Sequence, residues 1–205
     1  MKRTWILLAA AAPAAAEGMD PAYGRIMDLY RAGLSGDESV IMSGSDDFNF
    51  SAWQDCQYSD MDPLSAVGYA LADLDGDGNS ELVIADATEE ALLEGIVFDV
   101  WTVRDGAAVL IGRGWDRNRL YLTPPDEEGR YGYYQEGSSS AFESSYTFGR
   151  FEPGGPVTLH VLEFNSEAAE VWRLNGEPVS EEIARAVIDG WSAGTVRIPL
   201  TPFAQ

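Results

Sequence analysis

Residues Tyr69–Ala85 read YALADLDGDGNSELVIA, and this stretch decides how the rest of the chain is interpreted. The apolar runs Val67–Leu74 and Leu82–Ala85 lie on either side of a short acidic segment. Val, Ile and Tyr in runs of this length favour buried β-strands. Gly78 permits a sharp turn that a side chain would obstruct. The stretch therefore predicts two strands joined by a tight acidic loop.

The loop carries carboxylates at alternating positions. Asp73, Asp75 and Asp77 occupy its first, third and fifth positions, and Glu81 occupies its ninth. Calcium is a hard cation that takes about 6–8 oxygen ligands at roughly 2.3–2.6 Å, and the backbone carbonyl of Asn79 would add one. Carboxylates so close together repel one another unless a positive charge lies between them. The pattern predicts a bound Ca²⁺ ion, and the alternative is an Asp- and Gly-rich turn without an ion.

The loop differs from an EF-hand, because position twelve is Ile84 instead of a bidentate Glu and the flanks read as strands. The pattern Asp73-x-Asp75-x-Asp77-Gly78-x-x-Glu81-Leu82-Val83-Ile84 resembles the calcium loops of FG-GAP (VCBS-type) repeats. It is also similar to the single YALxDxDGDGxxELxI segment of many small secreted bacterial proteins of unknown function. The resemblance implies that the ligands are Asp73, Asp75, Asp77, Asn79 and Glu81. FG-GAP loops usually carry Asp at the ninth position, which is Glu81 in this chain. A second DxDxDG is not present in the sequence, which argues against a repeated propeller.

The first sixteen residues have the pattern of a signal peptide. Lys2 and Arg3 precede the apolar run Trp5–Ala12, and Ala14–Ala16 offers a small-residue cleavage site before Glu17. The apolar run is too short to span a bilayer. We therefore expect a signal peptide over residues 1–16, a single calcium-binding domain over residues 17–205, and a secreted or periplasmic location without membrane insertion.

The chain is strongly acidic, with a formal net charge of −21. Lys2 is its only lysine, so the basic side chains beyond the predicted signal peptide are all arginine. A charge of this sign opposes binding to nucleic acid or to an anionic membrane surface and favours cations and basic partners. The alternative interpretation is that the charge outside the loop only maintains solubility.

The periodicity predicts an α+β fold with a mainly antiparallel sheet. An N-terminal helix begins at Asp20-Pro21 and ends near Gly33, and a C-terminal helix begins at Ser180. Strands without long intervening helices indicate antiparallel pairing. Beyond the central hairpin, strands are predicted over residues 96–104, 107–111, 119–123, 131–135, 142–151, 157–164 and 171–174, with an edge segment over 196–203. The segment Ser35–Asp62 is expected to be irregular, with a short helix near Gln54. The calcium loop is expected to join two central strands.

Catalytic patterns are weak in this sequence. Cys56 and His160 are each the only residue of their type, so neither a disulfide within the chain nor a site with several histidines can form. Cys56 is expected to be a buried small hydrophobe, with a reactive thiol as the alternative, and His160 to be a core or strand-surface residue. A GxSxG elbow and a Gly-rich phosphate loop are both absent from the sequence. We therefore favour a non-enzymatic binding or interaction module. A carboxylate-dependent hydrolase of polysaccharide or cell wall remains the alternative.

Aromatic residues gather in the second half of the chain. Most of them are expected to lie in the core. The alternative is an exposed aromatic face that stacks on a carbohydrate or contacts a partner protein. The residues concerned are Tyr131, Tyr133, Tyr134, Phe142, Tyr146, Phe148 and Phe151.

Overall fold

The computed structural model describes residues 6–7, 19–88, 95–115, 117–167 and 171–204. Strands predominate, their pairing is mainly antiparallel, and a few short helices accompany them, which confirms the α+β class. The chain divides into two compact units. Unit 1 comprises Met1–Leu8, Asp73–Gly78 and Arg117–Arg197, and unit 2 comprises Ala9–Ala72, Asn79–Asp116 and Ile198–Gln205. The prediction of one domain over residues 17–205 stays a prediction.

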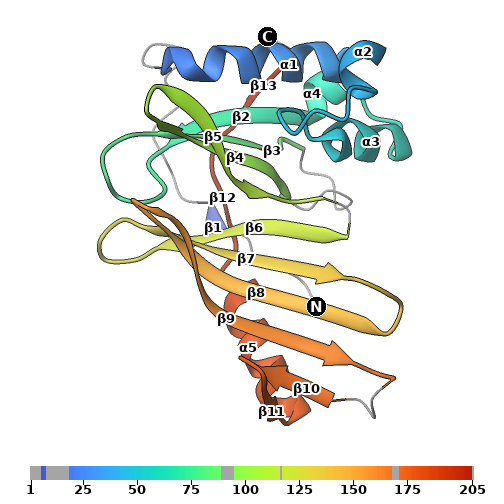
Figure 1. The fold of residues 1–205 in the computed structure, drawn as a ribbon, viewed down its shortest axis with the longest axis vertical. Helices are drawn as coiled ribbons and strands as arrows, with labels where there is room; N and C mark the ends of the chain where they lie inside the picture. Colours follow the sequence, from blue (N-terminus) through green and yellow to red (C-terminus); the bar gives the residue numbers. More distant parts are fainter. Residues whose placement is uncertain (1–5, 8–18, 89–94, 116, 168–170, 205) are drawn as a thin grey trace. The chain divides into compact units, whose positions relative to one another are not determined.

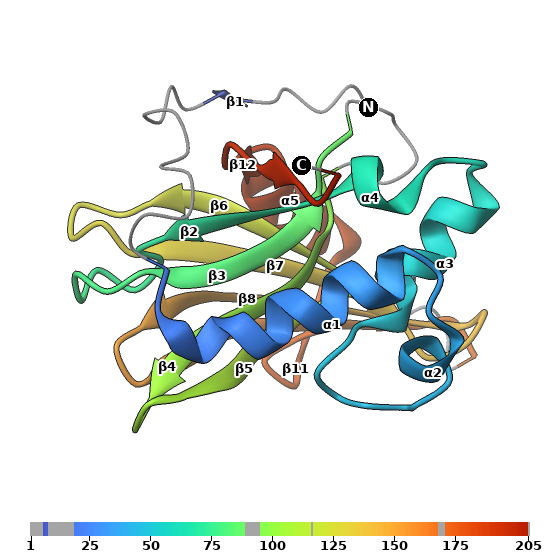
Figure 2. The same ribbon diagram turned by 90° about the horizontal axis from the view of Figure 1, so that it is seen from above.

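Unit 2 begins with a helix whose start is set by a side-chain cap. Asp20 Oδ1 accepts a hydrogen bond from Ala22 N–H (2.8 Å), and Pro21 supplies a backbone angle suited to the first turn. The 3₁₀ helix η1 (Pro21–Tyr23) leads directly into α1 (Gly24–Leu34). The buried face of α1 repeats at helical spacing and includes Ile26, Met27, Tyr30 and Leu34. Figure 2 shows α1 along the strands of this unit.

Three further short helices follow α1 in unit 2, namely α2 (Glu38–Ile41), α3 (Phe50–Tyr58) and α4 (Pro63–Ala66). Asp37 caps α2 and Asn49 caps α3, each through a side-chain oxygen that accepts a backbone N–H two residues later. The segment Ser35–Asp62 is therefore more helical than its Gly-, Ser- and Asp-rich composition predicts. Cap chemistry and burial of one face of α3 account for the difference.

The sheet of unit 2 has the strand order β13-β2-β3-β4-β5. All neighbours are antiparallel, and β3 is buried at each of its six residues. Phe203 packs between the rings of Tyr30 and Tyr69, at centroid distances of 5.9 and 5.2 Å. The strands are β2 (Val67–Ala72), β3 (Glu81–Asp86), β4 (Val97–Arg104), β5 (Ala107–Arg113) and β13 (Thr201–Pro202).

Unit 1 holds a second run of antiparallel strands, drawn side by side in Figure 1, in the order β6-β7-β8-β9-β10-β11. The two-residue strand β12 (Val196–Arg197) pairs with β6, and β1 (Ile6–Leu7) pairs parallel to β12. The six longer runs are β6 (Asn118–Pro125), β7 (Tyr131–Ser138), β8 (Glu143–Glu152), β9 (Gly155–Asn165), β10 (Val171–Leu174) and β11 (Glu177–Val179).

Helix α5 (Glu181–Ser192) covers part of one face of these strands. Ser180 caps it, since its Oγ accepts a hydrogen bond from Ile183 N–H (3.3 Å), and Glu181 and Glu182 suit the positive helix end. Ala184 is fully buried, and the Trp191 ring lies 5.3 Å from that of Phe148. The buried aromatic core of unit 1 includes Tyr121, Tyr133, Tyr134, Phe148 and Phe151. In contrast, Phe142 is exposed.

The predicted signal peptide, residues 1–16, lies outside the described residues apart from Ile6 and Leu7 of β1. Among the described residues, no helix combines the length and the hydropathy that a bilayer-crossing helix needs.

Candidate metal centre

The acidic loop joins β2 to β3. The register pairs Ala72 with Glu81 directly, so the loop proper runs over residues 73–80. Glu81 therefore belongs to the first pair of the hairpin and lies next to the start of the loop. The nearness of Asp73 and Glu81 follows from this local pairing alone.

Backbone hydrogen bonds to the aspartates curl the loop. Asp73 Oδ1 accepts from Gly76 N–H (2.8 Å) and Asp73 Oδ2 accepts from Gly78 N–H (3.0 Å). Asp75 Oδ1 accepts from Asp77 N–H (3.1 Å). Gly76 and Gly78 both have positive φ, +76° and +89°, which residues with a side chain rarely adopt. The alternation of Asp and Gly thus produces a tight turn in which the Asp73 and Asp75 carboxylates face the loop backbone.

The loop also contacts other residues of unit 1. The carbonyl of Leu74 accepts a hydrogen bond from Tyr131 N–H (2.8 Å) at the start of β7. A Cβ at Gly76 would lie 2.8 Å from the carbonyl oxygen of Glu128, closer than real Cβ contacts allow. Gly76 is therefore required by close approach as well as by its φ.

Three carboxylates converge at the base of the loop. Asp73, Asp75 and Glu81 each present an oxygen atom, and these three atoms lie within 4.8 Å of one another. Asp75 and Glu81 are buried, at 6% and 1% exposure. Two ligands on opposite sides of a calcium ion would be separated by at most about 5 Å, twice the metal–oxygen distance. The spacing and the all-oxygen donor set therefore fit a hard cation, and this cluster could hold a metal ion.

The electrostatics of the three carboxylates also favour a bound cation. Burial raises the pKa of the Asp75 carboxyl, and the negative charges of Asp77 and Asp73 raise it further, against the opposing hydrogen bond from Asp77 N–H. Glu81 Oε1 accepts a hydrogen bond from Thr102 Oγ1 (3.0 Å) on β4. A divalent cation at the cluster would remove the mutual repulsion that the carboxylates otherwise carry.

The other two predicted ligands lie on the exposed part of the loop. Asp77 and Asn79 are exposed on the loop, and the close group of acidic oxygens does not include Asp77. Ile84, at the twelfth position, is fully buried in β3. The hairpin therefore ends its oxygen-donor series at the ninth position, Glu81, and continues as a strand.

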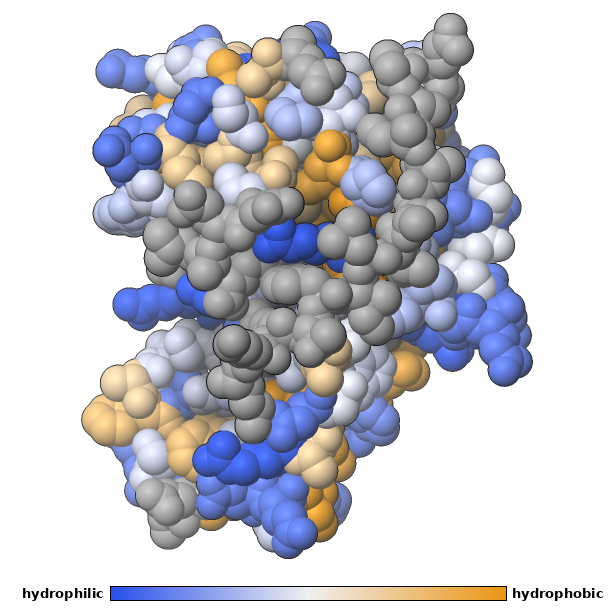
Figure 3. All heavy atoms as spheres, turned by 180° about the vertical axis from the view of Figure 1, so that it is seen from behind, coloured by the Kyte–Doolittle hydropathy of each residue, from blue (hydrophilic) through white to orange (hydrophobic). Residues whose placement is uncertain are grey.

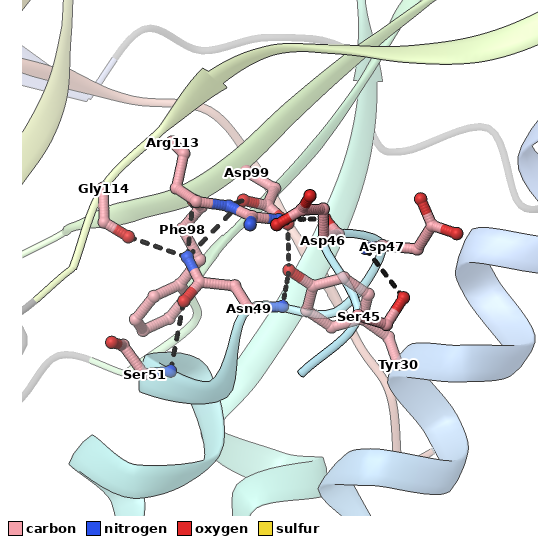
Figure 4. A network of polar contacts seen from close by, with 10 residues as sticks. All are labelled: Tyr30, Ser45, Asp46, Asp47, Asn49, Ser51, Phe98, Asp99, Arg113 and Gly114. Atoms are coloured by element: carbon pink, nitrogen blue, oxygen red, sulfur yellow. Dashed lines mark hydrogen bonds and ion pairs between the residues drawn. The ribbon is translucent and has the colours of Figure 1, made fainter. Parts of the chain in front are cut away.

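A second polar cluster, absent from the sequence-based expectations, lies inside unit 2 (Figure 4). Asp99 on β4 is fully buried and forms two short contacts with Arg113 on β5, from Nε (2.7 Å) and Nη2 (2.9 Å). Tyr30 Oη of α1 donates to Asp99 Oδ2 (2.5 Å), and Asn49 Nδ2 donates to the carbonyls of Phe98 (2.9 Å) and Gly114 (2.7 Å). The sequence signal was an aspartate within the apolar run of β4, but its partners lie far away in the chain.

Within the described residues, Cys56 and His160, which each occur once in the chain, have no surroundings that would activate them for catalysis. Cys56 is fully buried in α3, with Sγ 3.2 Å from the carbonyl oxygen of Ala52, and burial raises the pKa of its thiol to about 12. The thiolate needed for nucleophilic chemistry is therefore disfavoured near neutral pH. His160 is exposed on β9, and its Nδ1 lies 3.2 Å from Asn175 Nδ2.

No family model, curated protein or solved structure matches the chain. The resemblance to FG-GAP loops consequently stays a prediction.

Proposed function

We propose that this protein is a secreted or periplasmic, non-enzymatic calcium-binding module with a binding or interaction role. The observation that carries the proposal is the group of three carboxylate oxygens, from Asp73, Asp75 and Glu81, within 4.8 Å of one another. Two of these side chains are buried, so their charges are poorly solvated without a cation. The oxygen-only donor set favours calcium or magnesium over zinc or copper.

The ion would be structural. It would link the start of the loop to the first pair of the β2–β3 hairpin, and β3 is buried along its whole length. Asp77 and the Asn79 carbonyl would complete the shell once the ion draws the exposed part of the loop inward. Calcium accepts about 6–8 ligands in flexible geometry, and waters would supply the remainder. Binding to the folded chain alone would stabilise it by mass action.

The proposed location rests on the N-terminal sequence pattern and agrees with the chemistry. Extracellular modules bind calcium with dissociation constants of about 0.1–1 mM. Three to four carboxylates on a partly exposed loop suit that range. Much of the described surface on the face in Figure 3 is hydrophilic, in keeping with the net charge of −21, and this favours cations over nucleic acid.

Calorimetric titration of EDTA-treated protein with CaCl₂ tests the proposal. We expect one ion per chain, and Asp75→Asn should weaken binding by about tenfold or more because a buried ligand charge is lost. Asp105→Asn is the matched control, since Asp105 is an exposed hairpin-turn residue with φ +52°, which Asn tolerates. Absence of calcium uptake, or equal weakening by both substitutions, would show that the ligand assignment is wrong.

A further inference from the structure

A second candidate site lies in unit 1, between α5 and the strands β8–β10. It is a cavity of about 740 Å³, within the roughly 300–1,000 Å³ range of small-molecule sites. All of its lining residues fall within Arg117–Arg197, so it belongs to one compact unit. Figure 1 shows α5 beside these strands. The calcium loop contributes no residue to the lining.

The floor of the cavity is aromatic. Phe164 and Trp172 face each other across β9 and β10, with ring centroids 4.6 Å apart, and Tyr146 on β8 lies 6.2 Å from Trp172. All three side chains are half-buried, so part of each ring borders the cavity. Tyr146 continues the row inward to the buried ring of Tyr134, 6.4 Å away. The packed inner end of the row holds the outer rings in place.

One wall of the cavity is polar and comes from α5. Glu181, Arg185 and Asp189 repeat every four residues, which places them on one face of the helix. Arg185 donates to Glu181 Oε1 from Nε (2.8 Å) and Nη2 (2.6 Å), so a guanidinium and a carboxylate lie side by side on this face. Ser144 on β8 is the register partner of Phe164 and adds a hydroxyl group to the strand side of the cavity. Planar carboxylates and a guanidinium can each contact two neighbouring hydroxyl groups.

We infer that this cavity binds a neutral carbohydrate. A sugar ring has an apolar C–H face that stacks on flat aromatic rings and a rim of hydroxyls that both donate and accept hydrogen bonds. The cavity offers a matching floor of three rings and a wall of charged planar groups. This inference deepens the binding role proposed above by naming a ligand class.

Other ligand classes fit less well. Two carboxylates in the wall and the net charge of −21 oppose an anion such as phosphate. A quaternary ammonium group would gain from the aromatic rings, but it has no N–H or O–H group to donate to the carboxylates of the wall. A wholly apolar ligand would make no hydrogen bond to the charged wall and would exclude water from it. A polyhydroxylated, uncharged ring uses both the floor and the wall.

Titration of the full chain with cellohexaose, maltohexaose, xylohexaose and chitotetraose, followed by calorimetry and saturation-transfer NMR, tests the inference. We expect at least one of the four to bind. Trp172→Ala should weaken that binding about tenfold, and Asp189→Asn, at an exposed position that does not threaten folding, about threefold. Trp115→Ala is the control, because Trp115 is an exposed tryptophan of unit 2 and should leave the affinity unchanged.

Three outcomes would overturn the inference. These are no binding of any of the four sugars, binding by Trp172→Ala and Asp189→Asn that is as tight as by the parent chain, or binding of choline in place of the sugars. Repeating the titration with Asp75→Asn separates the two proposals, because that substitution weakens calcium binding while it leaves the residues that line the cavity unchanged. Loss of the bound oligosaccharide with release of new reducing ends would support the ligand class but would replace the non-enzymatic role by the hydrolase alternative.

Discussion

Asp99 shows how one buried charge connects distant parts of unit 2. Burial raises the pKa of its carboxyl, and the hydrogen bonds from Arg113, Tyr30 and Asn49 oppose that rise. The desolvation of a buried ion pair can equal its Coulomb attraction, so the pair is not by itself a large net stabiliser. Removal of one partner is different, because the other charge then remains buried and uncompensated.

Arg113→Met should therefore lower the free energy of unfolding by about 3 kcal/mol at pH 7. Without Arg113, the folded-state pKa of Asp99 rises further above its unfolded value. A raised carboxyl pKa contributes stability that is present below the unfolded pKa, about 3.9, and is lost as pH rises through the folded value. The deficit of the variant should consequently be smaller at pH 4.5 than at pH 7, as measured by urea unfolding at both values.

The control for this experiment is Asp28→Ala, which breaks the exposed pair Arg31–Asp28 on α1. Exposed pairs contribute about 0–1 kcal/mol, so the control should change stability little at either pH. A deficit for Arg113→Met that is equally large at pH 4.5 and pH 7 would contradict the assigned role of the Asp99 charge.

At the residue scale, the sequence predicts what is local. Asp73, Asp75 and Glu81 fall within nine residues, so their convergence could be expected from spacing and from the strands on either side. Asp99 binds partners 14, 50 and 69 positions away, and no periodicity encodes such contacts. For the same reason, the sequence did not predict that Trp172 and Asp189 line one cavity in unit 1. They come together only through the register of β9 and β10 and the position of α5.

At the scale of elements, the packing of strands β7–β9 requires a glycine at a position where a side chain would clash. Gly149 lies at a register shift in β8, where a Cβ would come within 2.3 Å of the Val157 carbonyl and 2.4 Å of the Tyr133 ring. Both neighbours are fixed, one as backbone and the other as a buried ring in contact with Phe151. The close packing of β8 against its neighbours therefore requires glycine here.

Gly149→Ala should lower the free energy of unfolding by about 3 kcal/mol, because overpacking forces backbone and side chains to move. Gly154→Ala in the β8–β9 turn is the matched control, since a Cβ there has no atom within 4 Å, and it should change stability by less than about 0.5 kcal/mol. Thermal and urea unfolding of both variants measure the difference. Equal stability of the two would show that the register of β8 is not set by Gly149.

The presence of most strands could be predicted from turn residues and from the alternation of apolar and polar residues. The Asp105-Gly106 and Asn175-Gly176 pairs have positive φ at all four residues and directly follow the predicted strands 96–104 and 171–174. Helix α3 was expected only as a short piece near Gln54, and it spans nine residues. Polar residues interrupt its apolar spacing. Its stability comes from the local Asn49 cap and from the burial of Ala52 and Cys56, and this burial is a tertiary effect.

At the scale of the whole molecule, the net charge of −21 complicates any test of the ion. Any added salt screens the self-repulsion of an acidic chain and so raises its stability without binding at a particular place. A specific site behaves differently, because its contribution saturates and depends on a few ligands. The two effects are separable by comparing salts at equal ionic strength.

Calcium at about 100 times its dissociation constant should stabilise the folded chain by about 2.7 kcal/mol and raise Tm by about 5–10 °C. Differential scanning calorimetry in NaCl, MgCl₂ and CaCl₂ of matched ionic strength measures the shift. Magnesium should give a smaller one, because its preference for near-ideal octahedral geometry fits a flexible loop poorly. At the same calcium concentration, Asp75→Asn should lose about half of this stabilisation or more, because its affinity is at least about tenfold lower, whereas Asp105→Asn should behave as the parent chain. An equal Tm in all three salts would show that screening alone stabilises the chain. It would contradict a structural ion in the loop.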